Sequence, residues 1–132
     1  MSEENLEIVR RHMEAWNGGN VEAMLARLTP DFEFVTAGVV PDLRPVYRGR
    51  QGWRDFWAAY RRTFESLRIE LNDLRDIDDL VVALITQRAR ARQGLEVERQ
   101  FGNVWTIRDG FVTRLVAYGD WDQALEAAGL SE

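Results

Sequence analysis

The sequence contains no cysteine, no lysine and only one histidine, and these absences remove whole classes of chemistry. Without cysteine the chain forms neither disulfide bonds nor thiolate nucleophiles nor thiolate metal sites. Without lysine it has no residue for Schiff-base formation, because all seventeen basic residues are arginine. A single histidine does not build a clustered-histidine metal site. The remaining chemistry is proton transfer and polarisation, and we expect no metal and no cofactor.

Several other signatures are also missing. Serine occurs only as Ser2, Ser66 and Ser131, and none lies in a nucleophile elbow. No glycine-rich nucleotide-binding pattern is present. The longest apolar run, Leu80 to Ile85, is too short for a membrane span or a signal peptide. The net charge of −5 disfavours nucleic acid as a partner. We therefore expect a cytoplasmic protein that binds neither membrane nor nucleic acid.

The single histidine, His12, lies in the apolar half of the first predicted helix. At about 100° per residue, the apolar side chains of Asn5 to Trp16 share one half of the helix, and His12 falls between Ile8 and Trp16. An imidazole directed into a core is either a hydrogen-bonded structural residue or a polar group in the wall of an apolar cavity. Only the second interpretation implies a function.

The hydrophobic periodicity predicts one domain over residues 1–132, with helices and strands in a definite order. The predicted helices are 5–16, a short helix capped by Asn20, 51–66 and 121–128. The predicted strands are 31–36, 68–76, 80–92, 96–108 and 111–120. The segment from Thr36 to Arg48 is expected to be a loop, long enough to act as a lid. This order indicates an α+β fold, in which three N-terminal helices cover the concave face of a mostly antiparallel sheet.

Two turns set the expected pairing of the last strands. Asp109-Gly110 is the strongest hairpin signal in the sequence. A three-residue loop at Gln93-Gly94-Leu95 aligns the two preceding strands. The pairs expected on the outer face are Arg92 with Glu96 and Arg90 with Glu98. The pairs expected on the inner face are Gln87 with Phe101, Ile85 with Asn103 and Ala83 with Trp105.

Polar residues are scarce on the expected inner face. His12, Asn103, Gln87 and Thr36 are separate polar points in an apolar surface, which is typical of a small-molecule pocket. We expect His12 to act as acid or base and Asn103 to polarise an oxygen atom of the ligand. The other expected ligand contacts are Phe34, Thr36, Trp53, Trp57, Tyr60, Gln87, Phe101, Trp105 and Leu115.

Structural explanations of the same residues remain open. One explanation is that His12 and Asn103 form hydrogen bonds with each other or with the backbone, because an unpaired buried polar group costs about 1 to 3 kcal/mol. The aromatic stripe on the predicted helix 51–66 is more typical of a core than of a cofactor site. The sequence pattern places no carboxylate on the inner face. The nearest candidate is Asp120, which strand alternation places on the outer face.

Five short segments resemble one known superfamily. These segments are Ala15–Asn20, Thr29–Glu33, Tyr47–Gly52, Phe101 with Val104–Gly110, and Ala124–Leu130. The chain from Asn5 to Leu130 resembles the SnoaL-like branch of the nuclear transport factor two-like superfamily, which includes ketosteroid isomerases, polyketide cyclases, scytalone dehydratase and limonene epoxide hydrolase. The resemblance implies a cone-shaped α+β fold with an internal cavity.

The resemblance also implies roles for three residues. His12 corresponds to the oxyanion-stabilising tyrosine of the isomerases, and Asn103 corresponds to their protonated aspartic acid. Thr36 corresponds to their proton-shuttling aspartate, and it is no base at neutral pH, which argues against isomerisation by that mechanism. The cyclases use a histidine and an aspartate together, and a histidine often stands where this chain has Asn103.

Three hypotheses follow. The first is a cyclase, isomerase or dehydratase that acts on a small, mostly apolar molecule with a polar tip. The second is a non-catalytic dimeric module that binds such a ligand in the same cavity, and the third is a purely structural role for the inner polar residues. The resemblance further implies a homodimer through the outer sheet face, where Val104, Val116 and Tyr118 offer apolar area.

Overall fold

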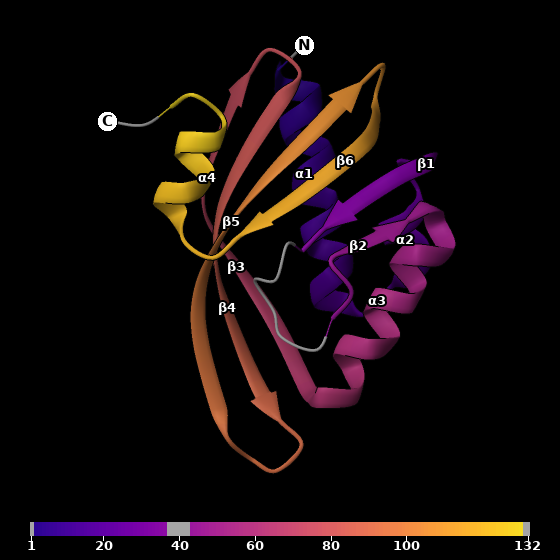
Figure 1. Ribbon diagram of the computed structural model, residues 1–132, viewed down its shortest axis with the longest axis vertical. Coiled ribbons are helices and arrows are strands. Elements are labelled where there is room, and N and C mark those ends of the chain that lie inside the picture. The colour runs from indigo at the N-terminus through magenta and orange to yellow at the C-terminus, as the bar shows by residue number, and fades with distance from the viewer. Residues whose placement is uncertain (1, 37–42, 131–132) are drawn as a thin grey trace.

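The computed structural model describes residues 2–36 and 43–130, which form one curved sheet flanked by helices (Figure 1). The helices are α1 (Ser2–Gly18), α2 (Val21–Leu25), α3 (Gly49–Thr63) and α4 (Trp121–Ala127). The strands are β1 (Leu28–Val35), β2 (Val46–Arg48), β3 (Phe64–Ile77), β4 (Leu80–Ala91), β5 (Glu96–Arg108) and β6 (Phe111–Tyr118). The strand order is β2-β1-β6-β5-β4-β3, and only β1 and β6 pair in parallel among these strands. The predicted α+β fold is therefore confirmed.

The helices α1 and α3 pack against the inner face of the sheet and enclose the main core. Trp53 on α3 and Trp105 on β5 are each 1% exposed and are the largest fully buried side chains described. Strand alternation directs odd-numbered residues of β4 and β5 toward this core, as the sequence predicts. Burial of the aromatic stripe of α3 stabilises the helix on the sheet, because removal of apolar area from water is the main driving force of packing.

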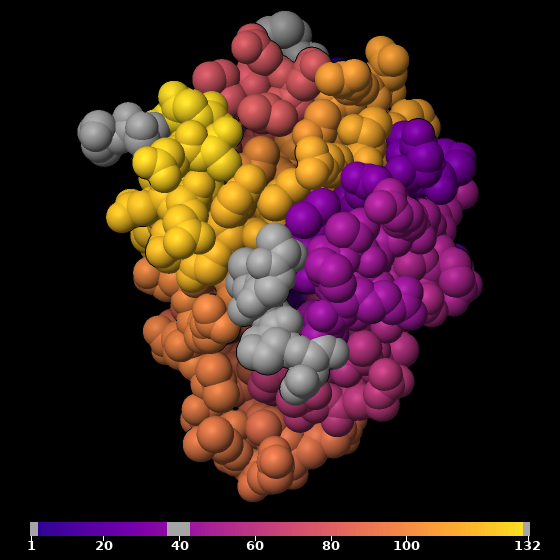
Figure 2. Space-filling model, viewed as in Figure 1, coloured from indigo at the N-terminus to yellow at the C-terminus, as the bar shows by residue number. Residues whose placement is uncertain are grey.

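The helix α4 lies on the opposite face of the sheet from α3. In Figure 2, which is coloured by residue number, the yellow α4 and the magenta α3 occupy opposite sides of the molecule. Ala124 of α4 and Ala128, the C-cap of this helix, pack against Val82, Leu84 and Val104 in a second apolar cluster. Val104 is only 8% exposed, so the expectation that it offers free apolar area on the outer face is wrong. The amphipathic pattern of a seven-residue helix does not reveal which face of the sheet it covers.

The predicted start of β1 at Asp31 is also wrong, because the strand begins at Leu28 and passes through Pro30. Leu28 pairs with Val112 of β6, and the pairing shifts between Leu28 and Glu33. Pro30 lies in this irregular part, where the missing N–H of proline is tolerated. Downstream, β2 occupies the end of the predicted loop, and the lid prediction rests on residues 37–42, which lie outside the described residues.

The predicted register between β4 and β5 is wrong by two residues. The observed pairs are Arg90 with Glu96, Arg88 with Glu98, Gln87 with Arg99, Ile85 with Phe101, Ala83 with Asn103 and Val81 with Trp105. The turn is longer than three residues, since the backbone N–H of Ala91 donates to the carbonyl of Leu95. Because the error is an even number of residues, every side chain keeps its predicted face.

Charged pairs occupy the outer face of the β4–β5 hairpin. Arg88 contacts Glu70 and Glu98, and Arg90 contacts Glu96. Arg92, predicted to join this ladder, instead donates to backbone carbonyls at the end of α3.

None of the described helices is long and apolar enough to cross a membrane.

Candidate functional site

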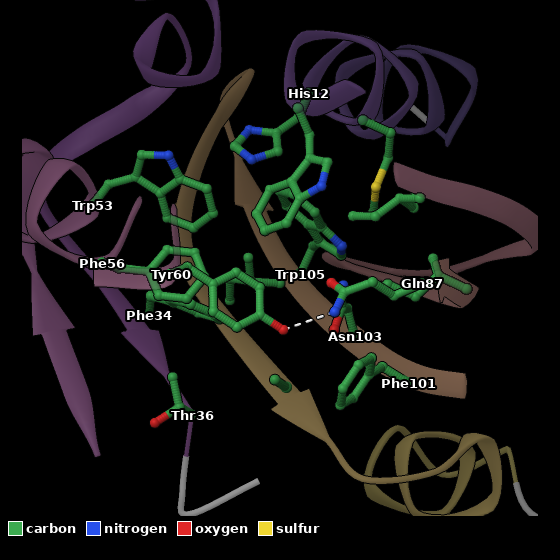
Figure 3. A pocket seen from close by; sticks show the side chains of 16 residues that line it. His12, Phe34, Thr36, Trp53, Phe56, Tyr60, Gln87, Phe101, Asn103 and Trp105 are labelled. Carbon is green, nitrogen blue, oxygen red and sulfur yellow. Dashed lines mark hydrogen bonds between the residues drawn. The ribbon is translucent and has the colours of Figure 1, made fainter. Parts of the chain in front are cut away.

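A cavity lies between α1, α3 and the inner face of the sheet (Figure 3). About 60 Å³ is open to the centre of a water-sized sphere. This exceeds the minimum of roughly 10 to 15 Å³ that one water needs, so the space has room for several waters or for one small ring. Most of the wall is apolar, with contributions from Met13, Trp53, Phe56, Ile85 and Leu115.

The structure brings nearly all the predicted site residues to this one cavity. The predicted residues that line it are His12, Asn103, Phe34, Thr36, Trp53, Tyr60, Gln87, Phe101, Trp105 and Leu115. Trp57 is the exception, because it packs edge-on against Trp16 at a centroid distance of 4.7 Å and lies beneath Arg61. Trp16 and Phe56 also line the cavity but were not predicted, although Trp16 follows His12 by one helical turn.

His12 projects from α1 into the aromatic end of the cavity. Its ring lies 5.0 Å from Trp53 and 4.9 Å from Trp105, measured between centroids, and both contacts are edge-on. Burial lowers the pKa of His12 from 6.5 to about 4, and a hydrogen bond to the backbone of Met24 opposes this only in part. The ring is therefore neutral at physiological pH.

One nitrogen of this neutral ring has no partner. Nε2 of His12 is buried and makes no hydrogen bond with any described residue. A neutral imidazole carries a proton on one nitrogen and a lone pair on the other, so Nε2 is open to a ligand as a hydrogen-bond donor or as an acceptor.

Tyr60 and Gln87 form a second polar point, away from His12. The side-chain amide of Gln87 donates from Nε2 to Oη of Tyr60 at 2.7 Å (Figure 3). Burial raises the pKa of Tyr60, although the Gln87 amide and the charge of Arg99 act in the opposite direction. The hydroxyl is thus neutral, and its proton has no acceptor among the described residues. Tyr60 offers a free donor to the cavity.

Asn103, which belongs to β5, lies beside Tyr60 and Gln87 in the cavity wall (Figure 3). Its half-buried amide makes no hydrogen bond with the described residues, so His12 and Asn103 do not satisfy each other. Thr36 is different, because its hydroxyl donates to the carbonyl of Arg44 at 2.6 Å. Thr36 therefore lines the cavity with its proton already engaged.

No carboxylate belongs to the described wall of the cavity. Asp120 caps α4 by accepting a hydrogen bond from the backbone N–H of Gln123 at 2.8 Å. Its predicted position away from the inner face is confirmed. Within residues 2–36 and 43–130, no group of three His, Asp or Glu side chains is arranged to hold a metal ion.

Solved structures with the same fold cover almost the whole chain. An NTF2-like protein of unknown function from Burkholderia pseudomallei K96243 has a TM-score of 0.81 at 21% identity, over 93% of this chain and 95% of that chain. TerC, co-crystallised with polyporic acid, has a TM-score of 0.82 at 22% identity, over 96% of this chain and 97% of that chain. IdmH from Streptomyces antibioticus, described as a putative polyketide cyclase, has a TM-score of 0.73 at 20% identity, over 93% and 96%. These identities establish the fold alone.

The sequence itself also matches a known family. A search of curated proteins gives no match. The family model of the SnoaL-like domain, however, matches residues 9–115, which is most of the chain and includes most of α1, β6 as far as Leu115, and every cavity-lining residue except Ala117. The chain belongs to the SnoaL-like domain family.

Proposed function

We propose that the protein binds a small, mostly apolar molecule with a polar tip inside this cavity. The proposal rests on three buried ring nitrogens of cavity-lining residues that have no hydrogen-bond partner among the described residues: Nε2 of His12 and Nε1 of Trp16 and Trp105. An unpaired buried polar atom costs about 1 to 3 kcal/mol. A ligand that hydrogen-bonds to these nitrogens recovers part of that energy, while its apolar body fills the aromatic wall.

His12 and Asn103 give this cavity a capacity for acid–base chemistry. Nε2 of His12 accepts a proton from the ligand, and the Asn103 amide donates a hydrogen bond to the ligand oxygen on which negative charge develops. With a pKa of about 4, His12 is a weak base that is always in its basic form at physiological pH. It suits removal of an acidic proton, such as one between two carbonyl groups. This chemistry is that of a cyclase, isomerase or dehydratase, and a protein of this fold is described as a putative polyketide cyclase.

A second function is a binding module without catalysis. It is favoured by the absence of a carboxylate from the described cavity wall, because a mechanism with two bases lacks its second group. In this case the ligand leaves the cavity chemically unchanged and stabilises the folded protein by mass action.

Turnover assays separate these two functions. Purified protein and the His12→Gln variant are incubated with a panel of polyketides and terpenoids that carry a carbonyl or hydroxyl group. An acid–base role predicts a loss of about a hundredfold or more in the variant. Glu14→Gln, at an exposed position of the same helix, is the matched control and retains the rate. Equal rates for wild type and His12→Gln remove the histidine from the mechanism.

Native mass spectrometry tests binding independently of turnover. A bound molecule that raises the melting temperature and is recovered intact supports the binding module. If the protein retains no ligand, and no molecule of the panel raises its melting temperature, the cavity is a packing defect of the core without a ligand. Both proposed functions are then wrong.

We also propose a homodimer through the part of the outer sheet face that α4 leaves uncovered. Val116 on β6 is half-buried there, whereas Val104 is covered and Tyr118 packs against the apolar cluster beneath α4. Sedimentation velocity tests the proposal with Val116→Arg, which places a charge in the contact. The variant is expected to be monomeric where the wild type is dimeric, and a monomeric wild type contradicts the proposal.

A further inference from the structure

Arg99 differs from its neighbouring arginines on the β4–β5 hairpin, because it lies on the inner face of the sheet. It pairs with Gln87 across the strands, and residues paired in this way project from the same face. Its guanidinium carbon lies 4.6 Å from the centroid of Phe101, which lines the cavity. Arg88 and Arg90 project from the opposite face and are held by glutamates there.

The charge of Arg99 is not compensated locally. It forms no ion pair and no side-chain hydrogen bond with the residues that the structure describes. The contact with Phe101 places the guanidinium beside a ring of the cavity wall and does not use its N–H donors. Its field also reaches the cavity interior, because it lowers the pKa of the Tyr60 hydroxyl against the effect of burial.

Tyr60 supplies a donor on the same side of the cavity. Its oxygen accepts from Gln87 at 2.7 Å, which limits the directions in which the O–H can point. The proton has no acceptor among the described residues, so it is available to a ligand. Gln87 therefore acts as a positioning residue for Tyr60, and Arg99 contributes positive charge beside them.

We propose that Tyr60, Gln87 and Arg99 form a subsite for an ionised oxygen of the ligand, either a carboxylate or an acidic enol or phenol carried on a single apolar ring. The inference deepens the proposed function and rests on it. The ring occupies the aromatic cavity, Tyr60 donates to the oxygen, and Arg99 provides the counter-charge. His12 lies at the other polar point of the cavity (Figure 3) and remains free for a second group.

The physical basis is the cost of placing an anion against an apolar wall. A buried charge is stable only when it is hydrogen-bonded and paired. Tyr60 meets the first requirement for charged and neutral ligands alike, whereas only an anion gains from Arg99. Arg99 is therefore the residue that determines specificity for an acid over its neutral analogue.

Benzoate and benzamide test this subsite, because they share one ring and nearly the same shape but differ in charge. Isothermal titration of the wild-type protein is expected to show benzoate binding about tenfold tighter than benzamide, a preference that weakens with added salt. Arg99→Gln should remove most of the preference and leave benzamide binding unchanged. Arg88→Gln, which removes the same charge from the outer face, should keep the preference.

The contributions of Tyr60 and Gln87 are separated by a double-mutant cycle. Tyr60→Phe should weaken benzoate about tenfold or more, because hydrogen bonds to charged groups are strong. Gln87→Leu should also weaken benzoate, but it should have no further effect in the Tyr60→Phe background. An additional loss in that background shows that Gln87 does not act through Tyr60.

Failure of the subsite is distinguishable from failure of the cavity. Equal binding of benzoate and benzamide to the wild type overturns the subsite and leaves the proposed ligand cavity intact. Equal effects of Arg99→Gln and Arg88→Gln overturn it as well, because the preference then reflects only net charge. If neither benzoate nor benzamide binds, the subsite is wrong. If no molecule of the wider panel binds, the proposed function is wrong as well. Arg99 is exposed, so its variant is expected to fold even if a Tyr60 variant does not.

Discussion

The imidazole of His12 packs edge-on against the indole of Trp105, with ring centroids 4.9 Å apart and planes inclined at 72°. This contact excludes water from the imidazole on one side, and Trp53 does the same on another side at 5.0 Å. The aromatic wall is thus the physical cause of the low proton affinity of His12. The same rings that shape the cavity keep the histidine neutral.

Protonation of His12 should therefore destabilise the folded protein. Its pKa is about 4 in the folded state, below the ordinary value of 6.5, so the unfolded state binds the proton more tightly. The contribution of His12 to stability is present above pH 6.5 and is lost as the pH falls toward 4, by about 3 kcal/mol in total. Denaturant unfolding across this range should show a smaller loss for His12→Gln than for the wild type.

A nuclear magnetic resonance titration measures the same group directly. His12 is the only histidine, so its imidazole signals need no assignment. The expected midpoint is about 4, and a midpoint near 6.5 would mean that the ring is solvated and that the cavity is open to water around it.

Gly102 should be intolerant of any side chain. A Cβ atom at this position would lie 2.3 Å from Cβ of Ala124, because α4 packs directly on β5 there. We expect Gly102→Ala to lower the free energy of unfolding by about 1 to 3 kcal/mol. Gly119→Ala is the matched control, since the nearest atom to its added Cβ lies at 3.9 Å. Ala124→Gly should restore part of the loss, and absence of rescue would mean that the clash is not with α4.

Local features of the fold were predictable from the sequence because they depend on adjacent residues. Asn20 caps α2 by accepting from the backbone N–H of Ala23, as predicted. Asp109 and Gly110 both adopt positive φ, of 53° and 82°, which the predicted tight hairpin requires. Alternation also assigned Asn103 and Gln87 to the inner face, so the candidate cavity was largely predictable.

Long-range features were not predictable in the same way. Alternation specifies a face but not a partner, so the register of β4 against β5 depended on a turn whose length was misjudged. The position of α4 on the outer face requires a glycine in β5 opposite an alanine in the helix, a relationship that periodicity does not reveal. The availability of the Tyr60 proton depends on Gln87, twenty-seven residues away.

Asn17 lies just beyond the predicted helix 5–16, but in the structure it belongs to α1 and its side chain joins α1 to β3. Its Nδ2 donates to the carbonyl of Ile69 at 2.9 Å, and its Oδ1 accepts from the backbone N–H of Ile69 at 2.7 Å. Asn17→Asp removes the donor and places a carboxylate beside a carbonyl, so we expect a loss of about 1 to 3 kcal/mol by chemical denaturation.

A matched substitution makes this prediction specific. Asn20 uses only its side-chain oxygen, as an acceptor at the start of α2, so Asn20→Asp should leave stability nearly unchanged. If both substitutions cost the same, added negative charge explains the effect, and the two hydrogen bonds of Asn17 are not its cause.

Asn103→Leu should separate stability from ligand binding. The half-buried Asn103 amide has no hydrogen-bond partner among the described residues, so an apolar side chain of similar volume removes a desolvation cost without breaking a bond. We expect the free energy of unfolding to stay constant or rise by about 1 kcal/mol. Benzamide binding should weaken in the same variant, because the amide no longer contacts the oxygen of the probe. A marked loss of stability would show that Asn103 is a structural residue, and unchanged benzamide affinity would show that it does not face the ligand.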